Sequence, residues 1–227
     1  MLKIVDNFYN EIINKVNNDF DFELYDEVAF SSFKAHVSKG KIKVYDCEKV
    51  GVLGMFETTS LFRQARTLAF TFAPIYIDGP LMIYEYHIRG NIHSVQIKIF
   101  DTFLNKKTDY KALKNKALIA KRRFNTIQDR ELLDKGNGKI LFDWSIGKKV
   151  YRKDAIELIK ISNMYISGYL EFLKTCEKCK GKEKKEIVNK FVEQELINSA
   201  YVFNVVRKNF GEEKGNEWLS VAMGKTA

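Results

Sequence analysis

Two runs of alternating apolar and polar residues, 81–89 and 92–100, lie on either side of the dipeptide Gly90-Asn91. Both runs are rich in β-branched and aromatic residues, and a two-residue connection that contains glycine is typical of a β-hairpin. With this turn, Arg89 pairs with Ile92, and the two strands continue in register from there. The pattern therefore predicts two antiparallel strands, Leu81–Arg89 and Ile92–Phe100.

The predicted hairpin has one apolar and one polar face, because successive side chains of a strand point to opposite sides. The apolar face consists of Tyr84, Tyr86, Ile88, Val95, Ile97 and Ile99. The polar face consists of Glu85, His87, Ser94, Gln96 and Lys98, with Glu85 opposite Gln96 and His87 opposite Ser94. Two interpretations remain open: a solvent-exposed face of a sheet that packs on one side only, or a face that lines a ligand cleft, where Glu85 and His87 transfer protons.

The chain is predicted to begin with a helix, which is followed by several strands and then by the hairpin. After the hairpin, mainly helices are predicted. The first helix covers 3–16, candidate strands lie between 19 and 45, and a buried strand runs from about Arg63 to Phe72. Beyond Asp101 the apolar period is that of helices, over 109–123, 154–173, 186–210 and 212–223, with one short strand over 139–145. Asp154 and Glu157 have the spacing of a helix capping box. This order predicts a single α+β domain over residues 1–227, with an antiparallel sheet covered by helices.

The chain is basic, with 38 Lys and Arg against 29 Asp and Glu and a formal net charge of +9. Such a surface suits nucleic acid, anionic lipid, anionic small molecules or an acidic protein, so the charge selects a set of partners. The basic residues are concentrated between Lys106 and Arg123, where Asp109 is the one acid. This segment is either a solvated helix face or a docking surface for an acidic partner.

Several classes of function are disfavoured by the motifs. There is no P-loop, Rossmann glycine fingerprint, GxSxG or HExxH sequence, and no signature of a nucleic-acid-binding fold, so we expect no nucleic-acid partner. No apolar run is long enough to span a bilayer, and the N-terminus lacks a signal-type core, so we expect a cytoplasmic protein without a membrane partner.

A metal site is also not expected. Cys176 and Cys179 have ligand spacing, but a closed site usually needs four protein ligands, and no second pair follows. His36, His87 and His93 are too scattered to form a metal site by spacing alone.

Two stretches resemble the ferredoxin-dependent bilin reductases and the related red chlorophyll catabolite reductases. The first is Thr59-Ser60-Leu61-Phe62-Arg63-Gln64-Ala65-Arg66, followed by a strand and then by Pro80-Leu81-Met82-Ile83-Tyr84-Glu85. The second is the tail, Val206-Arg207-Lys208-Asn209-Phe210-Gly211 through Glu217-Trp218-Leu219.

The resemblance implies a three-layer α/β/α sandwich in which a linear tetrapyrrole lies between a central antiparallel sheet and the C-terminal helices. It also implies radical reduction of a bilin such as biliverdin. Single electrons would come from ferredoxin or another acidic donor, and protons from side chains, with no bound flavin or nicotinamide. The basic segment 106–123 would then face ferredoxin, since ferredoxins are acidic and opposite charges steer association.

The resemblance also assigns roles to individual residues. Glu85 matches the position of the essential Asp of the bilin reductases, and a Glu there is similar to the chlorophyll-catabolite branch. Glu85 is therefore the expected proton donor, with His87 beside it as a second catalytic residue. Ser94 and Gln96 are expected to contact the substrate. Arg63 and Arg66 either pair with its propionates or are ordinary surface arginines.

The sequence departs from the family at two positions. The histidine that many bilin reductases carry on the preceding strand has no counterpart near Leu68 and Ala69, and His87 is expected to replace it. The Asp of the C-terminal helix falls near 199–200, where Asn198 is the nearest polar residue. These departures favour a rival hypothesis, a non-catalytic protein that binds a tetrapyrrole or haem on the same scaffold.

Overall fold

A central antiparallel sheet organises the computed structural model of the chain. The structure describes residues 2–21, 23–24, 33–35, 38–60, 65–105, 109–126, 145–198, 207 and 211–225. Within these ranges the sheet has eight strands in the order β1-β3-β4-β5-β6-β7-β8, and β2 also pairs with β3. The strands are β1 Glu23–Leu24, β2 Phe33–Ala35, β3 Ser38–Cys47, β4 Gly51–Ser60, β5 Ala65–Pro74, β6 Leu81–Arg89, β7 Ile92–Phe100 and β8 Ile146–Tyr151.

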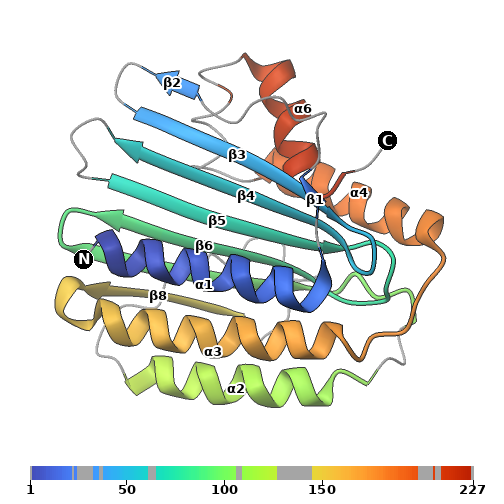
Figure 1. The fold of residues 1–227 in the computed structure, drawn as a ribbon, viewed down its shortest axis with the longest axis horizontal. Coiled ribbons are helices and arrows are strands. Elements are labelled where there is room, and N and C mark those ends of the chain that lie inside the picture. Colours follow the sequence, from blue (N-terminus) through green and yellow to red (C-terminus); the bar gives the residue numbers. More distant parts are fainter. Residues whose placement is uncertain are drawn as a thin grey trace.

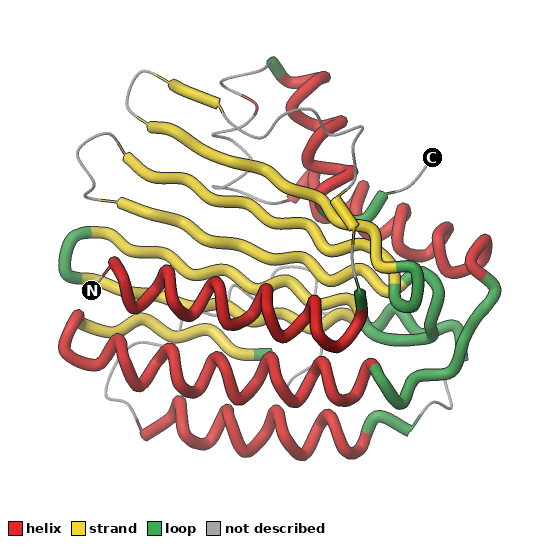
Figure 2. The backbone as a smooth tube through the Cα atoms, in the orientation of Figure 1, coloured by secondary structure: helices red, strands yellow, loops and turns green. Residues whose placement is uncertain are grey.

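Helices cover both faces of this sheet (Figure 1). The helices are α1 Leu2–Phe20, α2 Lys111–Thr126, α3 Ala155–Leu173, α4 Gly181–Asn198 and α6 Glu212–Ala222, with the short 3-10 turn η1 Arg152–Asp154 before α3. Helices α1 and α3 lie on one face with α2 beside α3, and α4 and α6 lie on the other (Figures 1 and 2). We call these the α1 face and the α6 face. The predicted three-layer α/β/α sandwich with an antiparallel sheet is therefore confirmed.

Successive side chains of each strand point to opposite faces of the sheet, and each face has its own core. On the α1 face, Phe70, Tyr84 and Val95 pack among the apolar residues of α1, α2 and α3. On the α6 face, Ile42, Phe56 and Ile83 pack against α4 and α6. The apolar stripe predicted for the first helix is confirmed at Phe8, Ile12 and Val16, which are buried.

The central hairpin has the predicted strands and the predicted register. β6 and β7 pair with Arg89 opposite Ile92, His87 opposite Ser94 and Glu85 opposite Gln96. Gly90 has φ of 59°, a left-handed conformation that glycine adopts without steric cost, and this allows the two-residue turn.

Other boundaries differ from the predictions for physical reasons. The buried strand is β5, Ala65–Pro74, and not 63–72. Strand β8 was not predicted, because Lys148 takes a buried position between Ile146 and Val150 and breaks the apolar alternation. A helix was predicted from residue 186, but α4 begins at Gly181. The first turns were not predicted because they are rich in lysine and resemble a polar loop, whereas Lys184 is in fact buried. Asp154 is the N-cap residue of α3, as the predicted capping box requires, but it makes no side-chain cap hydrogen bond.

Candidate active site

The candidate site lies on the α6 face, where the register brings polar residues of four strands into rows. The first row is Thr67, His87, Ser94 and Lys149, on β5, β6, β7 and β8. The second row is Ala69, Glu85, Gln96 and Gly147 on the same strands. Glu85 and Gln96 thus stand between two small residues, Ala69 and Gly147.

Glu85 is a partly exposed carboxylate between two buried residues of β6. Its neighbours in sequence, Tyr84 and Tyr86, point to the α1 face and are fully buried. No hydrogen bond to Glu85 arises from the described part of the chain, and its charge acts on His87. A partly exposed carboxylate without a fixed partner is free to exchange a proton with a bound molecule.

His87 is held from one side. Its Nδ1 atom lies 3.0 Å from the hydroxyl of Thr67, the residue directly opposite on β5. Burial lowers the pKa of His87 below its ordinary value, the charge of Glu85 opposes this, and the charge of Lys98 adds to it. The imidazole is therefore neutral at physiological pH.

A small cavity lies next to Glu85, between the sheet and α6. It has a volume of about 20 Å³, room for about one water molecule. Its walls are formed by residues of β4, β5 and β6, by Leu219 and Ala222 of α6, and by Met223 directly after that helix. Helix α6 approaches the sheet closely here, since a Cβ atom added to Gly54 would collide with the carbonyl group of Ala222. The end of α6 thus forms one wall of the site.

The structure brings four of the predicted site residues together, Glu85, His87, Ser94 and Gln96. Arg66 is not among them: it lies on the α1 face, where its guanidinium contacts Asp6 at 2.6 Å and Glu57 at 2.8 Å. Arg66 is thus separated from those four residues, because successive residues of β5 point to opposite faces and Thr67 takes the α6 face. Arg63 lies outside the described residues. Asn198 ends α4, and its side chain is outside what the structure describes.

Two lysines of the α6 face were not assigned to the site from the sequence. Lys149 lies opposite Ser94, and Lys98 is two residues from Gln96 on β7. Lys98 already belonged to the predicted polar face, but Lys149 was missed because β8 was not predicted. Alternation within 146–151 is the signal that places Lys149 and Lys148 on opposite faces.

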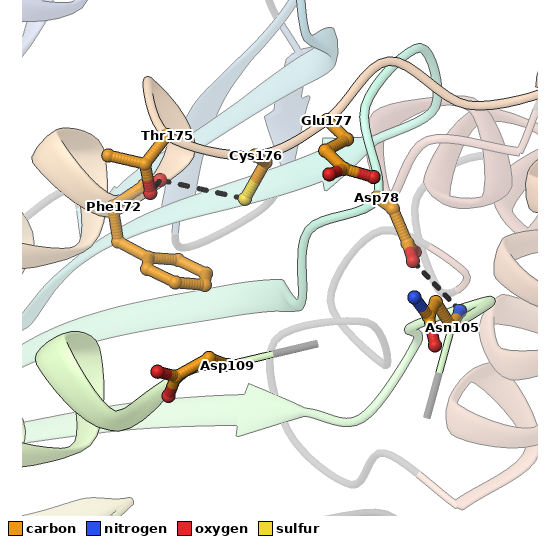
Figure 3. Close-up of a pocket in the computed structure, with 7 residues that line it drawn as sticks. All are labelled: Asp78, Asn105, Asp109, Phe172, Thr175, Cys176 and Glu177. Atoms are coloured by element: carbon orange, nitrogen blue, oxygen red, sulfur yellow. Dashed lines mark hydrogen bonds between the residues drawn. The ribbon is translucent and has the colours of Figure 1, made fainter. Parts of the chain in front are cut away.

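A second, larger hollow lies at the end of the sheet and has a different character. Its volume is about 260 Å³, and three of its residues are the acids Asp78, Asp109 and Glu177 (Figure 3). The remaining lining residues are Asn105, Phe172, Thr175 and Cys176. Three carboxylates repel an anionic ligand, so a tetrapyrrole with propionate groups does not suit this hollow.

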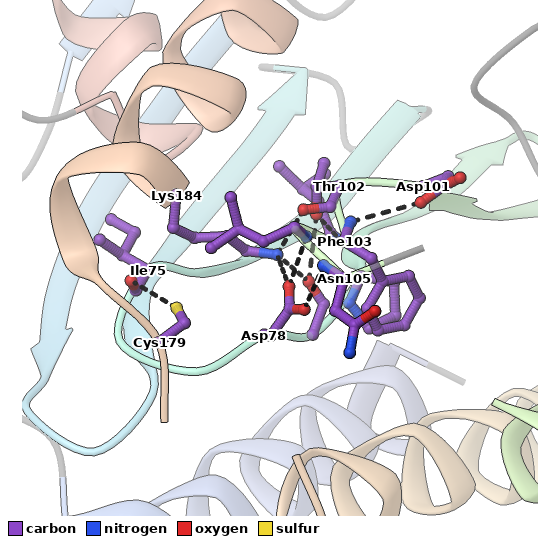
Figure 4. A network of polar contacts seen from close by, with 12 residues as sticks. Ile75, Asp78, Asp101, Thr102, Phe103, Asn105, Cys179 and Lys184 are labelled. Carbon is purple, nitrogen blue, oxygen red and sulfur yellow. Dashed lines mark hydrogen bonds and ion pairs between the residues drawn. The ribbon is translucent and has the colours of Figure 1, made fainter. Parts of the chain in front are cut away.

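Beside this hollow, a buried ion pair ties the end of the sheet to α4 (Figure 4). Lys184 is fully buried, and its Nζ atom donates to Asp78 at 3.1 Å, to the Gly79 carbonyl at 2.7 Å and to the Thr102 carbonyl. Burial lowers the pKa of Lys184, while the charge of Asp78 opposes that change.

Asp78, the acidic partner of this ion pair, also accepts hydrogen bonds from the backbone. Its carboxylate receives the amides of Leu104 at 2.7 Å and Asn105 at 2.9 Å. Burial alone would raise the pKa of Asp78, but these amides and Lys184 lower it overall. Because both charged groups have several hydrogen-bond partners, we interpret this ion pair as structural.

The two cysteines of the predicted weak motif lie in the loop before α4. Cys176 donates to the Phe172 carbonyl at 3.5 Å and Cys179 to the Ile75 carbonyl at 3.6 Å. Burial raises the pKa of Cys176 to about 12. Among the described residues no group of three or more His, Cys, Asp or Glu side chains is arranged to hold a metal ion.

The basic helix α2 lies in the layer of the α1 face and packs beside α3 (Figure 1). Its apolar side, with Leu113, Ala117 and Phe124, is buried, and Lys116 forms an ion pair with Glu171 of α3. The expected docking surface is therefore on the other side of the sheet from Glu85. Over the described ranges, none of the helices combines the length and apolar character of a bilayer span.

Comparison with solved structures gives a likeness over nearly the whole chain. A crystal structure of selenomethionine-labelled phytochromobilin synthase from tomato in complex with biliverdin matches with a TM-score of 0.79. The match covers 97% of this chain and 83% of the other, at 9% sequence identity. The likeness confirms the fold that the sequence resemblance implied. No protein-family model matches the sequence, and a comparison with curated proteins gives no match.

Proposed function

We propose that this protein binds a linear tetrapyrrole on the α6 face and reduces it with electrons supplied singly by ferredoxin or another acidic donor. The observation that carries the proposal is the placement of Glu85 and His87 side by side on a sheet face beneath α6, in a fold shared with a bilin-binding enzyme. The protein itself would contribute binding, orientation and protons, with no bound flavin or nicotinamide.

Three charged residues of the α6 face have chemical roles in this proposal. Glu85 takes up a proton from water through its partly exposed side chain and, as a carboxylic acid, donates that proton to the bilin as electrons arrive. Lys98 and Lys149 give the same face a positive charge that suits the anionic substrate. Because the cavity at Glu85 holds only about one water, the substrate lies across β6 and β7 beside α6 or displaces the end of that helix.

The test is an anaerobic titration with biliverdin followed by absorbance, after which ferredoxin and its reducing system are added. We expect a shifted bilin spectrum that bleaches or moves to the blue on reduction. Glu85→Gln should bind biliverdin nearly unchanged, while turnover falls about 100-fold or more, the contribution of a general acid. Glu48→Gln is the matched control, because Glu48 is an exposed acid in the turn after β3.

Two results would contradict the proposal in different ways. Absence of biliverdin binding by the unaltered protein would mean that the likeness concerns the fold alone. Full turnover by Glu85→Gln would remove Glu85 from the mechanism and leave the proton source to be found elsewhere on the α6 face.

A second candidate is a carrier that binds a tetrapyrrole or haem without reducing it. The observation in its favour is Ala69, which stands directly opposite Glu85 on β5. The family resemblance calls for a histidine on this strand, and alanine offers no group for proton transfer. Biliverdin binding without any spectral change on addition of reduced ferredoxin would support this candidate.

A further inference from the structure

The contact between Thr67 and His87 has a direction that the surroundings determine. Thr67 is 7% exposed, and its hydroxyl lies 3.0 Å from Nδ1 of His87. A hydroxyl carries one proton and two lone pairs, and leaving a buried donor without an acceptor costs more than leaving a lone pair unused. Within the described chain, Nδ1 is the one hydrogen-bond partner of this hydroxyl. The Thr67 hydroxyl therefore donates and Nδ1 accepts.

An accepting Nδ1 fixes the tautomer of the ring. A neutral imidazole has one protonated and one unprotonated nitrogen, so acceptance at Nδ1 places the proton on Nε2. Nε2 is on the far side of the ring from Thr67, and His87 is partly exposed. The ring therefore presents an N–H group, and not a lone pair, away from β5.

We propose that Thr67 is a positioning residue, whose hydroxyl holds neutral His87 with its proton on Nε2 as a hydrogen-bond donor to a ligand on the α6 face. The lowered pKa of His87 agrees with a neutral ring. A neutral His87 is a poor proton donor, but its N–H group can polarise and orient a carbonyl oxygen through a hydrogen bond. The proton then comes from Glu85, and the two neighbours on β6 have different tasks. The role toward a bilin rests on the proposed function, whereas the tautomer does not.

The decisive measurement is long-range ¹H–¹⁵N NMR of the imidazole rings in the protein alone, at about pH 8, where histidines are neutral. The chain has three histidines, so His87→Gln assigns the His87 signals by difference. We expect the Nε2–H tautomer of His87 in the unaltered protein and in Thr67→Ser, which keeps the hydroxyl. In Thr67→Val, which keeps the shape of the side chain, a mixture of both tautomers is expected.

Turnover provides the second readout. Thr67→Val should lower kcat for bilin reduction about tenfold, the effect of one lost hydrogen bond, and Thr67→Ser should restore it. An Nδ1–H tautomer in the unaltered protein, or the same tautomer fractions in Thr67→Val, would overturn the proposal. Failure of the proposed function is recognised separately, as absence of biliverdin binding by a protein whose His87 tautomer is the expected one.

Discussion

The two faces of the sheet use the same strands for opposite purposes. On β6, Tyr84 and Tyr86 are fully buried on the α1 face, while Glu85 and His87, one residue away, are partly exposed on the α6 face. On the α1 face, the Tyr86 hydroxyl has a partner within the protein, since it lies 2.9 Å from Nδ1 of His93. In the function proposed above, the α6 face instead offers the Glu85 carboxyl group and the His87 N–H group to a ligand. The proposal thus assigns stability and chemistry to successive residues of one strand.

The largest effect on stability is expected at Lys184, which joins helix α4 to the end of the sheet. Lys184→Met removes the charge that balances Asp78 and leaves the Gly79 and Thr102 carbonyls without their donor. Removal of one partner of a buried pair costs about 3–5 kcal/mol, so the free energy of unfolding in urea should fall by that amount. Helix α4 covers the α6 face, so this loss should also weaken biliverdin binding.

The matched control is Lys182→Met, an exposed lysine of the same helix, which should change the unfolding free energy by less than about 0.5 kcal/mol. An equally small change for Lys184→Met would show that the buried pair does not hold the layers together.

The next prediction compares the two faces through two successive residues of β5, Arg66 and Thr67. Arg66→Met removes the ion pairs with Asp6 and Glu57 on the α1 face, and should lower the unfolding free energy by about 1–3 kcal/mol. Biliverdin affinity should stay the same, since Arg66 points away from the site. Thr67→Val should show the reverse, with little loss of stability and a slower reaction. Weaker biliverdin binding by a stable Arg66→Met protein would return Arg66 to the site.

The sequence predicted the face of each hairpin residue because alternation and a two-residue turn determine the register locally. Glu85, His87, Ser94 and Gln96 are therefore together as predicted. The structure separates Arg66 from these four residues, because the motif that suggested it carries no information about which face a residue of β5 occupies. Lys149 was missed because β8 was not predicted. The burial of Lys184 was missed because lysine is usually exposed, and only the packing shows that Asp78 and two carbonyls compensate its burial.

The smallest expected effect compares the two histidines of the hairpin by their response to acid. Burial lowers the pKa of His93 on the α1 face, and the charge of Arg152 adds to this. The unfolded chain then binds more protons below about pH 6.5, so this contribution to stability is complete above that pH and decreases as the pH falls toward the folded pKa.

His93→Gln should remove this contribution and reduce the acid-induced loss of unfolding free energy between about pH 7 and 5 by up to about 1 kcal/mol. The pKa of His87 is lowered in the same direction, so His87→Gln should also flatten the profile. The two differ in their response to ligand. Saturating biliverdin should change the pH profile through His87 alone, because His93 is 1% exposed on the opposite face. If biliverdin altered the contribution of His93 as strongly as that of His87, the two faces would be coupled, and the separation of stability from chemistry in this sheet would be wrong.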